Sequence, residues 1–432
     1  MLRIITQQSE AHTELQRIGG RTHGSETLQV EETVRDILQT VRQQGDRALL
    51  DYTAKFDGQT LTLSQLRVSG SELDAAYQQV SKDLLDAISL ACRRVEAFHR
   101  QRIPKSWVQF TEDDNVILGK RYTPVDRAGL YIPGGRAAYP STVIMNAIPA
   151  KVAQVPRIVM VTPPSEGGKI SPAVLVAAQE AGITEIYRVG GAQAIAALAY
   201  GTETIPNVDV ITGPGNIYVT LAKKMVYGLV GIDSLAGPSE VLIIADQQAN
   251  PVHVAADLLA QAEHDPMAAA ILITPDEGLA KKVQQEVQGQ LQNHPRRILT
   301  EKAIAHYGLI IVVDSLKTAA ELSNLFAPEH LELEIAEPWD LLEQIRHAGA
   351  IFLGNSTPEA VGDYLAGPNH TLPTSGSARY SSALGVETFL KHSSLIQYSP
   401  KALSEMGRAI QTLADAEGLH SHRESVRLRM EN

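Results

Sequence analysis

Two residues of the central region have the types and spacing of metal ligands. Gln261 and His264 lie three positions apart within residues 258–265, an apolar-periodic segment that predicts a helix. This spacing places both side chains on one helix face. An amide oxygen and an imidazole nitrogen suit Zn²⁺ and related divalent ions. Taken alone, however, a histidine near a helix end is more often a capping or surface residue.

Two further potential ligands lie far along the chain. Asp363 follows Gly362, and His422 lies in the polar tail. Together with Gln261 and His264 they would complete a four-ligand site of nitrogen and oxygen donors. Spacing alone permits such a site but does not require it.

Glu329 and His330 are adjacent, where a helical stretch meets an apolar alternation. A neighbouring carboxylate and imidazole can divide the roles of base and acid when both reach one substrate. The alternative is a solvated pair at the entrance to a strand.

Glycine-rich loops occur three times, at residues 131–135, 189–193 and 212–216. The last two follow a predicted strand and open a predicted helix, where backbone N–H groups and the helix dipole can hold a phosphate. The full G-x-G-x-x-G pattern is absent, because Tyr218 occupies the third glycine position. Each loop alone is explained as a tight turn, but three together favour a nucleotide or phosphate ligand.

These residues must be positioned by an α/β framework. Near-continuous apolar runs are typical of strands buried on both faces, as in parallel sheets. They occur at residues 157–162, 185–189, 208–212, 241–245, 269–274, 309–313 and 350–353. Helical patterns lie between and after them, at residues 171–181, 192–200, 217–227, 251–263, 277–291 and 400–416. The alternation appears twice, so we expect two parallel-sheet units after a mainly helical region of about 130 residues.

Composition excludes several classes of protein. The 432 residues include 38 basic and 49 acidic side chains, which argues against a nucleic-acid or anionic-membrane partner. No apolar run approaches the ~18 residues that span a bilayer, and the first residues lack a secretory signal, so we expect a cytoplasmic protein. The single cysteine, Cys92, excludes a disulfide framework and is typical of small core filler in a helix.

Taken in order, the motifs resemble those of the histidinol dehydrogenase family, which makes histidine from histidinol in two NAD-dependent oxidations. The stretches that carry the resemblance span nearly the whole chain: residues 129–135 (GLYIPGG), 190–196 (GGAQAIA), 213–216 (GPGN), 236–240 (AGPSE), 261–265 (QAEHD), 327–331 (APEHL), 362–364 (GDY) and 367–370 (GPNH).

The resemblance implies a role for each matching residue. One zinc ion per subunit would be held by Gln261, His264, Asp363 and His422, and the acid–base pair would be Glu329 and His330. The substrate L-histidinol would be contacted by these six residues and by Ser239, His370 and Glu417, and NAD by Tyr131, Gln193 and Asn216. The tail also offers His420, but His422 keeps the family's spacing from Glu417.

The resemblance also implies a homodimer with shared active sites, in which Glu417 and His422 serve the neighbouring subunit. We therefore expect two Rossmann-like but incomplete parallel-sheet units, a helical N-terminal region and a small extended C-terminal domain involved in dimer exchange. The expected divisions are an N-terminal arm (1–25), a first α/β domain (26–128 and 239–380), a second, NAD-binding α/β domain (129–238) and a C-terminal dimerisation segment (381–432).

Overall fold

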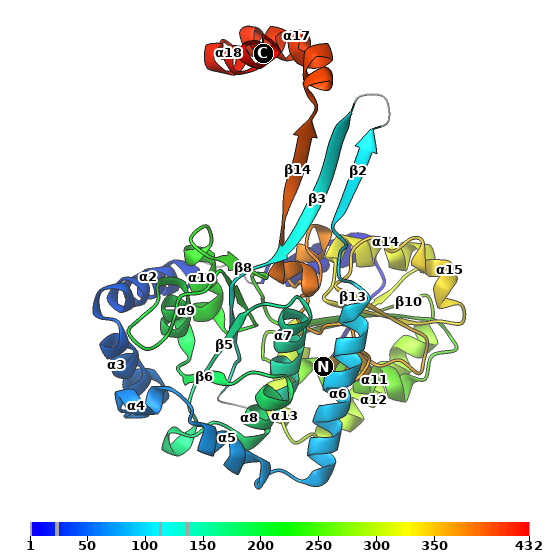
Figure 1. Cartoon of the computed structure of the whole chain (residues 1–432). Helices are drawn as coiled ribbons and strands as arrows, with labels where there is room; N and C mark the ends of the chain where they lie inside the picture. Colours follow the sequence, from blue (N-terminus) through cyan, green and yellow to red (C-terminus); the bar gives the residue numbers. More distant parts are fainter. Residues whose placement is uncertain (1, 22–25, 112–114, 135–137, 432) are drawn as a thin grey trace.

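The computed structural model describes residues 2–21, 26–111, 115–134 and 138–431 of the chain. Two parallel sheets form the body, and an antiparallel ribbon leaves it (Figure 1). The first sheet has the strand order β1 (Arg3–Ile5), β11 (Gly308–Val312), β10 (Ala269–Thr274), β9 (Glu240–Ala245), β12 (His330–Glu334) and β13 (Ala350–Leu353). The second has the order β6 (Glu185–Arg188), β5 (Arg157–Thr162), β4 (Arg127–Tyr131), β7 (Val210–Thr212) and β8 (Gly231–Ile232).

Helices cover both faces of the first sheet. Alternate residues of a strand point to opposite faces, so Val241 and Ile243 of β9 join one core cluster and Leu242 and Ile244 join the other. The helices of the first face are α11 (Pro251–Ala262), α12 (Glu277–Gln292) and α13 (Arg297–Tyr307). Those of the second face are α1 (Gln8–Gly19), α14 (Leu316–Phe326) and α15 (Pro338–Leu342).

The second sheet is covered in the same way. One face packs on α5 (Gly70–Tyr77), α6 (Lys82–Arg100), α7 (Pro140–Val152) and α8 (Pro172–Glu180). The other packs on α2 (Glu26–Gln44), α3 (Asp46–Asp57), α9 (Gly191–Tyr200) and α10 (Ile217–Val226). The described part of the body also contains the short helices α4 (Leu63–Leu66) and α16 (Glu359–Tyr364).

The packing of the N-terminal region differs from the expected grouping of residues 26–128 with 239–380. The apolar stripe of α2, formed by Val34, Ile37, Leu38 and Val41, lies in the core cluster of α9 and α10, on the second sheet. In addition, β1 pairs with β11 and so extends the first sheet. The N-terminal arm and the helices that follow it are thus divided between the two sheets.

Most strands of the body lie where the apolar runs predicted them, and their parallel pairing confirms the α/β fold class. The start of the chain is mainly helical, as expected, but its last part also contains three strands that the sequence did not predict, β2 (Trp107–Thr111), β3 (Val116–Pro124) and β4. Most residues of β2 are exposed, so this strand lacks the half-buried alternation by which strands are recognised.

A ribbon carries the C-terminal segment away from the body (Figure 1). Strand β14 (Leu390–Tyr398) pairs antiparallel with β3, which also pairs with β2. Beyond the ribbon, α17 (Pro400–Ala416) and α18 (His420–Met430) pack against each other. Large apolar side chains are exposed on this extension, among them Phe110 (67%), Ile396 (71%) and Leu413 (66%). Among the described residues, no helix combines the length and the apolar character needed to cross a membrane.

Candidate active site

The predicted acid–base pair lies at the amino end of the first sheet. His330 is the first residue of β12, next to the start of β9, where Glu240 is the first residue. Gln261 reaches the same point from the last turn of α11, and its side-chain nitrogen lies 3.1 Å from His330 Nδ1. The pairing of β12 with β9 therefore brings together residues that are 69 to 90 positions apart.

His330 is held as a neutral imidazole with one basic nitrogen. Its Nδ1 lies 3.0 Å from the backbone oxygen of Glu240. A carbonyl only accepts, so this contact places the ring proton on Nδ1 and leaves Nε2 as the base. A hydrogen bond from the Gln261 side-chain nitrogen would instead require Nδ1 to be unprotonated. Because the carbonyl of Glu240 can only accept, we assign the proton to Nδ1. Burial lowers the pKa of His330 to about 4, so the ring is uncharged at neutral pH.

Glu329 is buried beside the histidine. Its Oε2 accepts a hydrogen bond from the backbone N–H of Glu240 at 3.0 Å and lies 3.7 Å from His330 Nδ1. Burial, and then the nearby Glu240 carboxylate, raise the pKa of Glu329 well above its usual value. The ionised form of this carboxyl group is consequently a stronger base than an exposed carboxylate.

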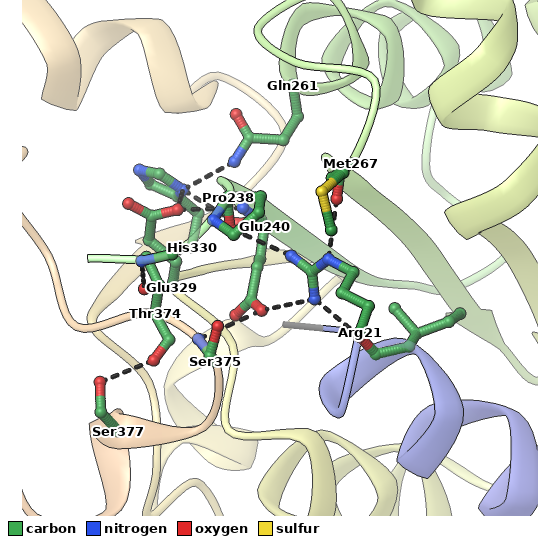
Figure 2. A network of polar contacts seen from close by, with 12 residues as sticks. Arg21, Pro238, Glu240, Gln261, Met267, Glu329, His330, Thr374, Ser375 and Ser377 are labelled. Carbon is green, nitrogen blue, oxygen red and sulfur yellow. Dashed lines mark hydrogen bonds and ion pairs between the residues drawn. The ribbon is translucent and has the colours of Figure 1, made fainter. Parts of the chain in front are cut away.

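Glu240 connects both residues to a buried arginine, as Figure 2 shows. Its Oε1 lies 3.0 Å from Arg21 Nη1, and both side chains are almost fully buried. The Arg21 guanidinium also donates to the backbone oxygens of Met267 (2.7 Å), Ile18 (2.8 Å) and Pro238 (3.0 Å). The sequence analysis gave neither Arg21 nor Glu240 a role. The available signal was an acidic residue at the head of an otherwise apolar strand.

The expected metal ligands of the body converge on His330. Donor atoms of Asp363 and His330 lie within 4.8 Å of each other, and the charges of Asp363 and His264 both act on the pKa of His330. Glu359, at the start of α16, joins them: donor atoms of His330, Glu359 and Asp363 lie within 4.8 Å of one another. The sequence analysis missed Glu359, although it lies four residues before Asp363 and thus on the same helix face.

An unpartnered polar atom supports a metal ion at this donor set. Within the described part of the chain, Oε1 of Gln261, one of the expected zinc ligands, is buried and has no hydrogen-bond partner. Buried polar atoms without a partner are uncommon, and an ion or ligand is one explanation for them. Nitrogen and oxygen donors of this kind suit Zn²⁺.

Two of the expected substrate contacts border the same site. His370 Nδ1 donates to the backbone oxygen of Asp363 at 3.0 Å, and burial lowers the pKa of this histidine. Ser239 directly precedes β9, and its backbone oxygen accepts a hydrogen bond from Ala269 at 3.0 Å. Both residues therefore flank the Glu329–His330 pair.

The glycine-rich loops meet at the carboxyl end of the second sheet. The hydroxyl of buried Tyr131, at the end of β4, accepts a hydrogen bond from the N–H of Gly191 at 3.2 Å. Gly213 has a φ of +113°, and a Cβ at this position would lie 2.0 Å from the Tyr131 backbone oxygen. Gln193 is buried in the first turn of α9, and the side-chain oxygen of exposed Asn216 caps α10. Gly135, in the first loop, lies outside the described residues.

The two tail residues are not brought to this site within one chain. Glu417 directly follows α17 and His422 lies in α18, both exposed, at the far end of the ribbon from the body (Figure 1). A site that includes them would need the tail of another subunit.

Comparison with known proteins identifies the family. A family model described as histidinol dehydrogenase matches residues 21–430. The chain belongs to the histidinol dehydrogenase family. It is 74% identical to histidinol dehydrogenase 2 of Trichormus variabilis and 73% identical to histidinol dehydrogenase of Thermosynechococcus vestitus, each over 431 residues. These alignments cover 100% of this chain and 99% and 100% of the relatives.

A solved structure agrees with this assignment. The crystal structure of histidinol dehydrogenase from Elizabethkingia anophelis matches with a TM-score of 0.93 and 40% identity, covering 99% of this chain and 97% of that one. The resemblance found in the sequence and the expectation of an NAD-dependent oxidoreductase that acts on histidinol are thereby confirmed.

Proposed function

We propose that this histidinol dehydrogenase oxidises L-histidinol to L-histidine in two steps, through L-histidinaldehyde, with two NAD⁺ and a zinc ion. One observation carries the proposal: the backbone N–H and oxygen of Glu240 contact Glu329 and His330, and so hold the two side chains next to each other beside potential metal ligands. The product places the enzyme in histidine biosynthesis. We further propose a cytoplasmic location, because the reaction draws on the cell's NAD pool.

The proposed zinc ligands are Gln261, His264 and Asp363 of one subunit and His422 of the partner subunit. When bound, the metal would orient the imidazole and amine of histidinol, with Lewis acidity as a secondary contribution. Glu359 adds a further carboxylate beside His330 and Asp363. Ser239, His370 and the partner subunit's Glu417 would contact the substrate.

His330 acts as the base for the first oxidation. Its unpartnered Nε2 takes the hydroxyl proton of histidinol, while a hydride leaves the carbon that bears this hydroxyl group for NAD⁺, which yields the aldehyde and NADH. The backbone oxygen of Glu240 accepts a hydrogen bond from His330 Nδ1–H and so stabilises the imidazolium that forms. Tyr131, Gln193 and Asn216 are the proposed NAD contacts, at the meeting point of the glycine-rich loops.

Glu329 activates water for the second oxidation. The aldehyde must gain water before a second hydride can leave, and the Glu329 carboxylate takes a proton from the water as its oxygen attacks the carbonyl carbon. A thiol could serve instead by forming a thiohemiacetal. The only thiol is Cys92, which is buried in α6, and burial raises its pKa to about 11. The hydrate route is therefore the better supported.

The stoichiometry tests the chemistry. With limiting histidinol and excess NAD⁺, we expect two NADH per histidinol, without free aldehyde. One NADH per histidinol, with aldehyde released, would contradict the proposal.

Mixed dimers test the proposed sharing of active sites. With activity measured as histidine formed from histidinol, Glu329→Gln blocks the second oxidation in the body and His422→Asn removes the proposed metal ligand of the tail, so each homodimer should form very little histidine. A mixed dimer contains one intact body facing one intact tail, and random reassortment should restore about a quarter of the wild-type activity, since half of the dimers are mixed and half of their sites are intact. Mixtures that stay inactive after verified subunit exchange would refute a shared site.

A further inference from the structure

A second group of carboxylates lies next to the active site, on strand β12. Leu331 and Leu333 pack into the core cluster of α1 and α14. His330, Glu332 and Glu334 point to the opposite face, because side chains alternate along a strand. That face lies against α11, and Asp257 of α11 meets the two glutamates there.

The geometry of this carboxylate cluster matches a shared cation. One oxygen from each of Asp257, Glu332 and Glu334 lies within 4.8 Å of the others. Oxygen ligands bind Ca²⁺ at about 2.3–2.6 Å and Mg²⁺ at about 2.0–2.1 Å, so two oxygens on opposite sides of one ion are roughly 4–5 Å apart. All three side chains can therefore reach one ion.

Burial without partners is the second, independent observation. Glu334 is 4% exposed, and neither of its carboxylate oxygens has a hydrogen-bond partner in the described chain; the same holds for Oε2 of Glu332, which is 1% exposed. No lysine or arginine among the described residues forms an ion pair with any of the three carboxylates. Burial and the charge of Asp257 raise the pKa of Glu334 to about 8. Buried carboxylates need either protons or a cation to offset the cost of desolvation.

We propose that Asp257, Glu332 and Glu334 form a second cation site, for a hard divalent ion such as Mg²⁺ or Mn²⁺. All three donors are carboxylate oxygens, which these ions prefer, with water completing the coordination shell. The donor set thus differs from the mixed nitrogen and oxygen set proposed for zinc.

This cation would support the elements that carry the zinc ligands. Glu332 Oε1 accepts a hydrogen bond from the backbone N–H of Glu359 at 2.7 Å and so fixes the start of α16, the helix of Asp363. Asp257 lies one turn before Gln261 on α11. An ion between Asp257 and Glu332 would tie α11, β12 and α16 together. Its role is structural, and no step of the proposed reaction depends on it.

Manganese binding to the zinc-loaded enzyme tests the site. We expect one Mn²⁺ per chain by electron paramagnetic resonance, with zinc content unchanged by elemental analysis, and a higher Tm in Mn²⁺ than in its absence. Glu334→Gln should abolish both the bound Mn²⁺ and the rise in Tm. Glu337→Gln, which changes an exposed carboxylate three residues further on, should leave both unchanged.

Three outcomes would overturn the proposal. Mn²⁺ that enters only as zinc leaves would show binding at the catalytic site alone. Equal binding in Glu334→Gln and wild type would place the ion elsewhere. If the Tm of the wild type rises on acidification and does not change when Mn²⁺ is added, the carboxylates are stabilised by shared protons and not by a cation. The first and third measurements need no variant; if Glu334→Gln does not fold, Asp257→Asn, at a half-buried residue, replaces it.

Discussion

Arg21 and Glu240 form an ion pair of 3.0 Å inside the protein, although they lie 219 positions apart in the chain. The pair fixes the first residue of β9, whose backbone contacts both Glu329 and His330. Arg21 touches none of the proposed reacting atoms. It is a positioning residue, because it acts through the backbone of Glu240.

Replacement of Arg21 tests this positioning role. Arg21→Met leaves the Glu240 charge buried without a partner, and breaking such a pair costs about 3–5 kcal/mol. We expect kcat to fall about tenfold or more, with zinc content preserved and the pH profile of kcat shifted, since the His330 environment moves. Arg21→Lys should recover part of the activity, because it restores the charge but not the forked hydrogen bonds. A folded Arg21→Met enzyme with normal kcat and pH profile would exclude this role.

Glu329→Gln should separate the two oxidations. Loss of the carboxylate removes the base for water activation, so we expect aldehyde oxidation to slow by about 10²- to 10³-fold. Alcohol oxidation depends on His330 and should slow much less. Single-turnover rates with histidinol and with histidinaldehyde measure the two steps separately. Equal losses in both would show that Glu329 has no special role in water activation.

Cys92→Ala should leave both oxidations intact. The thiol is buried in α6, and its raised pKa of about 11 keeps it protonated at neutral pH, so it is a poor nucleophile. We expect a kcat within about twofold of wild type and a small loss of stability, in line with the small volume removed. A folded variant that loses turnover would instead support a thiohemiacetal intermediate.

His264→Asn should weaken metal binding without unfolding the chain. The residue is exposed, two positions beyond the end of α11, and it belongs to none of the hydrophobic core clusters. We therefore expect a large fall in bound zinc and in activity, while the circular dichroism spectrum stays that of wild type. Chelation of the wild-type enzyme should likewise leave it folded. Global unfolding in either experiment would mean that the fold depends on the metal.

His99 should make the protein less stable in acid. The ring is buried in α6 with both nitrogens unpartnered among the described groups, and burial lowers its pKa from 6.5 to about 4. Between these pH values the unfolded chain binds a proton that the folded chain does not, so stability falls as pH drops through this window. The full effect is about 3 kcal/mol. In urea titrations, the free energy of unfolding of His99→Leu should fall less steeply than that of the wild type between pH 6.5 and pH 4. Equal slopes for the two proteins would contradict the role given to His99.

The sequence predicted the parallel strands well because their apolar runs are nearly continuous, as in β5 and β10. It did not predict β12 as a buried strand, because the HLELE pattern alternates like a half-exposed strand. The structure buries that polar face against α11, where it carries the candidate base His330 and two members of the carboxylate cluster. At β12, residues proposed to have functions replace the continuous apolar run that normally marks a strand buried on both faces.

The site itself could be predicted only in part. Motifs marked Glu329, His330 and Gln261 as candidates because these residues lie in contiguous, family-specific stretches, and the fold places the three side chains together. The supporting contacts could not be found in this way. Arg21 reaches Glu240 across 219 positions, and Glu359 reaches Glu332 across 27, so only the folded chain shows these pairs. Tertiary contacts of this kind leave no local signal in one sequence.

The ribbon that carries the tail has a consequence for the newly made protein. Strand β3 emerges from the ribosome early, at residues 116–124, but its partner β14 is made only at residues 390–398 of 432. Until then one edge of β3 has no strand to pair with, and an unpaired edge is prone to join other chains. The ribbon is thus completed only after the strands and helices of the body have been made, so productive assembly and aggregation compete for the same edge during synthesis.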